Sequence, residues 1–193
     1  MRVRHLLAGS TVAVLAAVGL PGLAQAAPIV PAQAVLAAHE FPAGSTEYKA
    51  RAEVGEPAGQ LVSDSVCGRA EHAVDQRLEG ARSTDASARR GALTLESSVI
   101  DRPMSATMRN AFTTCAASTP ASSRLLPSAL PADLSRYQGF VVRIGAGQAL
   151  LGVVDVRGAS VGVSVEGGSS SPADEGAFFQ VLRAQVAKVE RQP

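Results

Sequence analysis

The chain has 193 residues, a length typical of one domain. It carries 18 Lys and Arg against 17 Asp and Glu, and this near balance excludes a polyanion binder held mainly by bulk charge. Two Tyr, five Phe and no Trp argue against base-stacking platforms and aromatic cages. Two Cys, with His39 and His72 the two histidines of the expected mature chain, are too few for a Cys/His zinc site. We therefore expect no nucleic-acid partner, no metal and no cofactor.

The first 26 residues have the pattern of a secretory signal peptide. Arg2 and Arg4 precede the apolar run LLAGSTVAVLAAVGL, and Ala24-Gln25-Ala26 supplies a small-x-small cleavage site. The alternative is a membrane anchor, but a membrane-spanning helix needs about 20 apolar residues, and this run has only 15. We predict a signal peptide over 1–26, an N-terminal segment over 27–45, and a secreted or cell-envelope domain over 46–193 with no membrane span. Arg outnumbers Lys 16 to 2, a bias typical of GC-rich genomes such as those of actinobacteria.

Cys67 and Cys115 are the only cysteines. Export would place them where disulfides persist, so the simplest prediction is one intramolecular bridge. A reactive thiol or redox pair is the first alternative, although the two residues do not form a C-x-x-C motif. A disulfide to another chain is the second alternative.

The pattern of residues 27–88 predicts a short helix, a strand, a longer helix and a loop. A short helix is expected over 32–38, ended by Phe41-Pro42. Charged residues alternate with uncharged ones over 46–54, which is typical of a half-buried strand. A helix then runs from Ser63 or Asp64 to about Glu79, with an apolar residue at every fourth position. The residues 80–88 are polar and predict a loop.

The middle of the chain predicts a second strand and a second long helix. The strand covers 92–100, and Pro103 marks the helix start. Because Cys115 lies on the apolar face near the end of this helix, a bridge would join the start of the first long helix to the end of the second. The stretch 118–135 is long and irregular. It is either a functional loop or a covering segment with a short helix.

Three strands over 137–145, 148–157 and 160–166 predict an antiparallel meander, followed by a helix capped at Ser171 and running to about Glu190. One sheet face is predicted to hold Phe140, Val142, Ile144, Leu150, Val154, Val156, Val161, Val163 and Val165. The other mixes apolar and charged residues and is expected to be partly covered: Val141, Arg143, Leu151, Val153, Asp155, Ser164 and Glu166. The element order predicts a single α+β domain, a mainly antiparallel sheet with helices packed on one face.

Catalytic motifs are nearly absent. Residues 158–162 match G-x-S-x-G, but that hydrolase motif needs a helix after the turn and a later His, and no His follows Ser160. Arg143, Asp155 and Glu166 form the most prominent polar set, on neighbouring predicted strands. Cross-strand charge pairing explains them structurally. The functional alternative is that they face a ligand in a shallow groove between the sheet and the long loop.

The layout resembles a known group of exported proteins. The carriers of the resemblance are the signal peptide, Phe41-Pro42-Ala43-Gly44 before a strand, Cys67 opening one helix and Cys115 ending the next. In these features the chain resembles mycobacterial exported proteins, which are small secreted or lipid-anchored domains. Some of them are related to the extracellular sensor domain of PknH-type receptor kinases.

The resemblance implies a non-catalytic binding or sensing module, with a Cys67–Cys115 bridge as the only carried-over feature. This chain departs from the kinase sensor domain in having cysteines for one bridge rather than two, and in lacking a kinase domain. We expect a monomeric, non-enzymatic envelope domain that binds a small ligand, lipid or protein partner. A secreted hydrolase with an unrecognised site is the alternative, and an interaction protein acting on a host surface is a third hypothesis.

Overall fold

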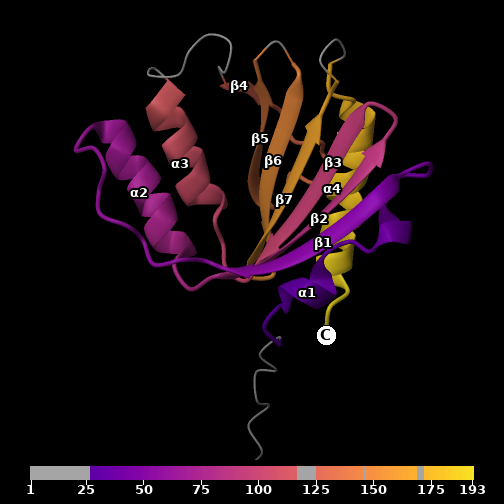
Figure 1. Cartoon of the computed structure of the whole chain (residues 1–193), viewed down its shortest axis with the longest axis horizontal. Helices are drawn as coiled ribbons and strands as arrows, with labels where there is room; N and C mark the ends of the chain where they lie inside the picture. Colours follow the sequence, from indigo (N-terminus) through magenta and orange to yellow (C-terminus); the bar gives the residue numbers. More distant parts are fainter. Residues whose placement is uncertain (1–26, 117–124, 146, 169–171) are drawn as a thin grey trace, which may run out of the picture.

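The computed structural model describes residues 27–116, 125–145, 147–168 and 172–193. The strands of this part form one antiparallel sheet in the order β1-β2-β3-β7-β6-β5-β4 (Figure 1). They are β1 Thr46–Val54, β2 Arg82–Arg90, β3 Leu93–Ile100, β4 Leu125–Ser128, β5 Gln138–Ile144, β6 Ala149–Val156 and β7 Ala159–Glu166. The helices are α1 Pro31–Ala34, the 3-10 turn η1 Ala38–Glu40, α2 Val66–Leu78, α3 Ser105–Cys115 and α4 Glu175–Glu190. The predicted signal peptide lies outside the described residues.

One face of the sheet carries the hydrophobic core and is covered by α1 and α4. The apolar side of α4 presents Phe178, Val181, Leu182, Val186 and Val189, all buried. Phe178 lies directly on the sheet at Gly152, where an added Cβ would stand 2.7 Å from the ring. A glycine is therefore required at this point of β6 for α4 to approach the sheet closely.

A buried glutamine fastens the N-terminal segment to this core. Gln185 of α4 is fully buried and donates to the carbonyl of Ala34 at 2.6 Å. Its side-chain oxygen accepts from the backbone N–H of Leu36 at 2.9 Å and from the Ser97 hydroxyl at 2.8 Å. Since an unpaired buried amide is costly, these three bonds select one position for the segment after α1.

The opposite face carries α2 and α3, which lie together on one side of the sheet (Figure 1). Helix α3 packs on β5 and β6, and Phe112 meets Phe140 edge to face at 5.5 Å. Helix α2 packs on α3, to which the Cys67–Cys115 disulfide joins it. No helix within the described ranges is long and apolar enough to cross a membrane.

The α+β class, the antiparallel sheet, the single domain and the disulfide pairing are confirmed. The helices, however, occupy both sheet faces rather than one, because α3 packs on the side of Phe140 and α4 on the side of Gly152. The predicted loop over 80–88 is also wrong, since β2 begins at Arg82. Its inward residues are Thr84, Ala86 and Ala88, which are too small to give a strong apolar signal.

The structure differs from the sequence predictions in three further segments. The expected helix over 32–38 is the four-residue α1 followed by the separate turn η1. The last helix begins at Glu175, capped by the Asp174 carboxylate, which accepts from the N–H of Ala177 at 3.0 Å. The stretch 118–135 contains β4, while its part up to 124 lies outside the described residues.

The predicted face of β5 is wrong by one residue. Val141 pairs with Gly152 and belongs to the core face, whereas Phe140 and Val142 pair with Val153 and Leu151 on the α3 face. The register of the β5–β6 hairpin, Ile144 opposite Ala149, sets this alternation. A one-residue change of register moves every side chain of a strand to the other face, and residue pattern alone did not specify it here.

Candidate functional site

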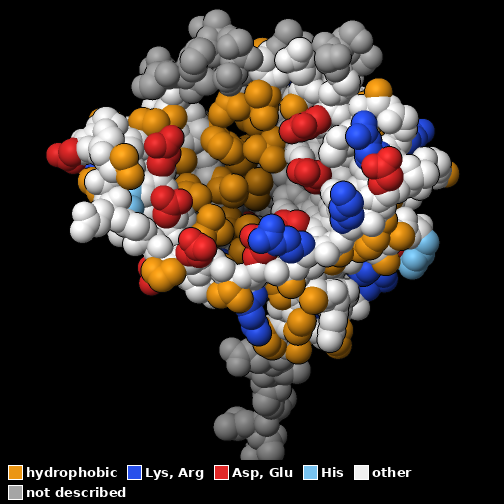
Figure 2. All heavy atoms as spheres, viewed as in Figure 1, with side chains coloured by type: hydrophobic (Ala, Val, Ile, Leu, Met, Phe, Trp, Pro, Cys, Tyr) orange, Lys and Arg blue, Asp and Glu red, His pale blue; other side chains and the backbone are white. Residues whose placement is uncertain are grey.

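A cleft of about 760 Å³ lies on the sheet face that the core does not use. Its bottom is formed by β1, β2, β3, β7 and β6, and α3 borders it on one side. Figure 2 shows this cleft as a hollow, with hydrophobic side chains gathered inside it and charged side chains along its two sides. The volume falls within the range of roughly 300–1,000 Å³ that is usual for small-molecule sites.

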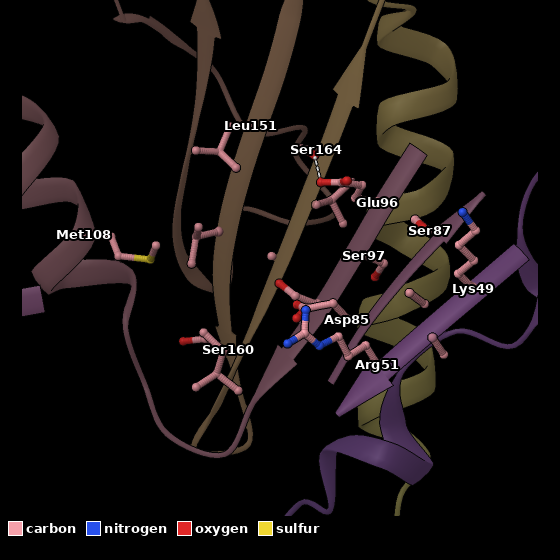
Figure 3. A pocket seen from close by; sticks show the side chains of 17 residues that line it. Lys49, Arg51, Asp85, Ser87, Glu96, Ser97, Met108, Leu151, Ser160 and Ser164 are labelled. Atoms are coloured by element: carbon pink, nitrogen blue, oxygen red, sulfur yellow. Dashed lines mark hydrogen bonds between the residues drawn. The ribbon is translucent and has the colours of Figure 1, made fainter. Parts of the chain in front are cut away.

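One side of the cleft is apolar. Met108 projects from α3 toward the sheet, and Leu151 stands on β6 opposite it (Figure 3). Val153 of the same strand also lines this wall. Ile100 of β3 adds to this surface. The neighbouring positions of β7 are small, because a Cβ on Gly162 would lie 2.4 Å from the Ser98 hydroxyl oxygen. These small residues keep the bottom of the cleft open beside the apolar wall.

The other side is polar and charged, and comes from β1, β2 and β3. Lys49 and Arg51 reach it from β1, Asp85 from β2 and Glu96 from β3. Arg51 points toward Asp85 in Figure 3, and the Ser164 hydroxyl donates to Glu96 at 3.0 Å. The cleft thus offers an apolar wall and a charged wall to one occupant.

The surroundings of Asp85 in the cleft raise the pKa of its carboxyl. Partial burial in the cleft raises its pKa above the ordinary 3.8, and the negative charges of Glu53 and Glu96 raise it further. Arg51 acts in the opposite direction without cancelling these effects. The cleft therefore favours the neutral form of Asp85 more than water does, and a positively charged ligand group beside this carboxyl would offset the effect.

The structure does not bring the predicted set Arg143, Asp155 and Glu166 together. Arg143 lies on the core side of β5 and forms an ion pair with Glu175 at the start of α4, with an N–O distance of 2.6 Å. Asp155 and Glu166 mark opposite ends of the β6–β7 ladder, six residues and about 20 Å apart along the strands. The predicted cross-strand cluster is therefore wrong.

Asp155 instead caps a helix from a distant strand. Its carboxylate accepts from the backbone N–H groups of Met104 at 3.1 Å and Ser105 at 3.2 Å. The hydroxyls of Ser105 and Ser160 also donate to it. Helix α3 has no cap from its own first residues, so this carboxylate satisfies its exposed N-terminal donors and attaches α3 to the sheet.

The G-x-S-x-G segment has an equally structural role. Arg157 and Gly158 form the two-residue turn between β6 and β7, and both have positive φ, as a type I′ hairpin turn requires. Ser160 is fully buried within β7, where its oxygen also accepts from the Met104 N–H at 2.6 Å. No helix follows this turn, so the geometry of a hydrolase nucleophile is not formed here.

Among the described residues, one group could supply three metal ligands: Cys67, Glu71 and Cys115. Because the two sulfurs are joined in the disulfide, they are not thiolates. Comparisons with protein-family models, curated proteins and solved structures give no match to this chain. The cleft geometry is consequently the basis for a functional proposal.

Most of the cleft could not be predicted from the sequence. Leu151, Val153 and Ser164 were placed on one partly covered, mixed face, and they do share the cleft side. Arg51 belonged to a recognised strand with alternating charge, but nothing linked that strand to β6. Asp85 lay in a segment taken for a loop, so its alternation with buried alanines was the one available signal.

Proposed function

We propose that this chain is an exported, non-catalytic domain that binds a small amphipathic ligand in the cleft above β3, β7 and β6. The single observation that carries the proposal is the contrast between the two cleft walls. Met108, Leu151 and Val153 suit an apolar tail, and Asp85 with Arg51 suits a polar or charged head. Burying such a tail contributes about 25 cal/mol per Å² of apolar surface removed from water.

The binding role is favoured over catalysis by the composition of the cleft. Among the residues that the structure describes, the lining contains neither histidine nor cysteine, and Ser160 is engaged by Asp155 and Met104. The disulfide between α2 and α3 is in keeping with an extracytoplasmic location. The resemblance to mycobacterial exported, sensor-like domains agrees with the same role, and it remains part of the proposal.

The test uses the chain secreted with its own leader from an actinobacterial host. Native mass spectrometry first detects any co-purified small molecule. The purified protein is then titrated with dodecanoate and with dodecylamine, which share a tail and differ in head-group charge. We expect saturable one-to-one binding of at least one of them, because the charged wall presents both signs.

A matched pair of variants locates the site. Leu151→Asn places an amide in the apolar wall and should weaken binding about tenfold, which corresponds to about 1.4 kcal/mol. Leu126→Asn makes the same change on β4 at a leucine that is 47% exposed and outside the cleft, and should leave binding unchanged. Equal effects of the two variants, or no binding of either probe and no co-purified molecule, would refute the proposal.

A further inference from the structure

Strand β1 ends the sheet, and its outer edge faces away from every other strand (Figure 1). All nine of its residues are exposed. The bond from the N–H of Gly55 to the carbonyl of Ala81 identifies which residues face β2, since bonded pairs alternate along an antiparallel ladder. Lys49, Arg51 and Glu53 therefore bond to β2.

The backbone groups of Ala50, Ala52 and Val54 consequently point outward. Within the described ranges, no loop or side chain forms a hydrogen bond with these outward groups. Unpaired edge groups of this kind are a template for another strand. What distinguishes this edge is the order of charges beside it.

Arg51 and Glu53 form an ion pair on the cleft side of β1, with an N–O distance of 2.9 Å. Their side chains are 81% and 43% exposed, so both remain accessible to a partner. If a second copy of β1 lies antiparallel and is centred on Ala52, each Arg51 stands opposite the Glu53 of the other copy. On the other side, Val54, which is 65% exposed, then lies opposite Ala50.

Each neighbouring register that keeps the outward groups in contact brings like charges together. Sliding the second copy by two residues in one direction places Arg51 opposite Arg51, between two Lys49–Glu53 pairs, and in the other direction it places Glu53 opposite Glu53. Like charges at directly opposed positions destabilise a strand pair. The charge pattern therefore favours one register.

We propose that two copies of this chain associate through antiparallel pairing of β1 with β1, centred on Ala52. The occupant is a second copy, because the edge is complementary to itself in charge. A two-fold axis then makes each contact occur twice. The contact is short, so it should be a weak and concentration-dependent dimer rather than an obligate one. It replaces the expectation of a monomer; it shares Arg51 with the proposed ligand site but does not require the ligand.

Sedimentation equilibrium of the secreted, mature protein over a wide dilution series tests the pairing. The wild-type mass should rise with concentration toward twice the monomer mass. Arg51→Glu gives each copy two acids at this edge, and Glu53→Arg gives each copy two bases, so each variant alone should be monomeric. A mixture of the two should form a one-to-one heterodimer, because the opposed charges are again complementary.

Ala52→Pro is a second variant that removes an outward N–H and leaves the bonds between β1 and β2 in place. It should abolish the dimer while far-ultraviolet circular dichroism and the thermal midpoint show an intact fold. A wild-type mass that stays at one chain would overturn the proposal. So would a dimer that persists in Arg51→Glu and Ala52→Pro, or folded charge variants that fail to associate when mixed.

Discussion

Replacing Asp155 by alanine should detach the start of α3 from the sheet. The carboxylate accepts from two backbone N–H groups, of Met104 and Ser105, and from the hydroxyls of Ser105 and Ser160. Both serines are buried, at 1% and 0% exposure. The Met104 N–H keeps the Ser160 oxygen as an acceptor, so the main losses are one helix cap and the acceptor of two buried hydroxyls.

The magnitude follows from these losses. A lost N-terminal cap costs about 1 kcal/mol. Each buried hydroxyl left without an acceptor costs at least about 1 kcal/mol. Asp155→Ala should therefore lower the free energy of unfolding by about 3 kcal/mol. Asp155→Asn keeps one carbonyl oxygen and loses the negative charge at the helix N-terminus, so about 1 kcal/mol is expected.

Equilibrium urea unfolding of both variants measures these values. Glu166→Ala is the matched control, because Glu166 is an exposed carboxylate at the end of β7 and its removal should change stability by less than about 0.5 kcal/mol. If Asp155→Ala loses no more stability than Glu166→Ala, the capping role of Asp155 is wrong. Its carboxylate would then be available for a ligand, as the sequence analysis first suggested.

Three further changes probe other parts of the molecule. Gln185→Met should lower the free energy of unfolding, measured by urea denaturation, by about 3 kcal/mol. The reason is that the N–H of Leu36, the carbonyl of Ala34 and the hydroxyl of Ser97 lose their hydrogen-bond partners. A loss below about 1 kcal/mol would show that water replaces the amide. Replacing both Cys67 and Cys115 by alanine should cost about 4 kcal/mol, the chain-entropy value for a sequence separation of 48, and equal unfolding midpoints for the variant and wild type would contradict it. Asp85→Asn should stabilise the protein at neutral pH, because the pKa of Asp85 is raised in the folded state and its ionisation therefore opposes folding. That advantage should disappear as the pH falls below the ordinary value of 3.8, and a stability difference that is constant with pH would refute the cause given for the shift.

Much of the secondary structure follows from local periodicity. The apolar stripe of α4 and the alternation of β6 and β7 repeat at intervals that only a helix or a strand can bury on one side. The disulfide pairing was predictable from number alone, because a chain with two cysteines has one internal pairing to make. These features can be predicted without knowing which helices and strands contact one another.

The cleft and the role of Asp155 depend on which elements meet, and only the tertiary structure decides that. The β5–β6 register moves Phe140 to the α3 side, and β2 becomes a strand because β1 and β3 bond to both of its edges. Asp155 caps a helix some 50 residues earlier in the chain. Local pattern reports which residues can be buried or exposed, whereas register and long-range hydrogen bonds select the neighbour, and here the neighbours make the site.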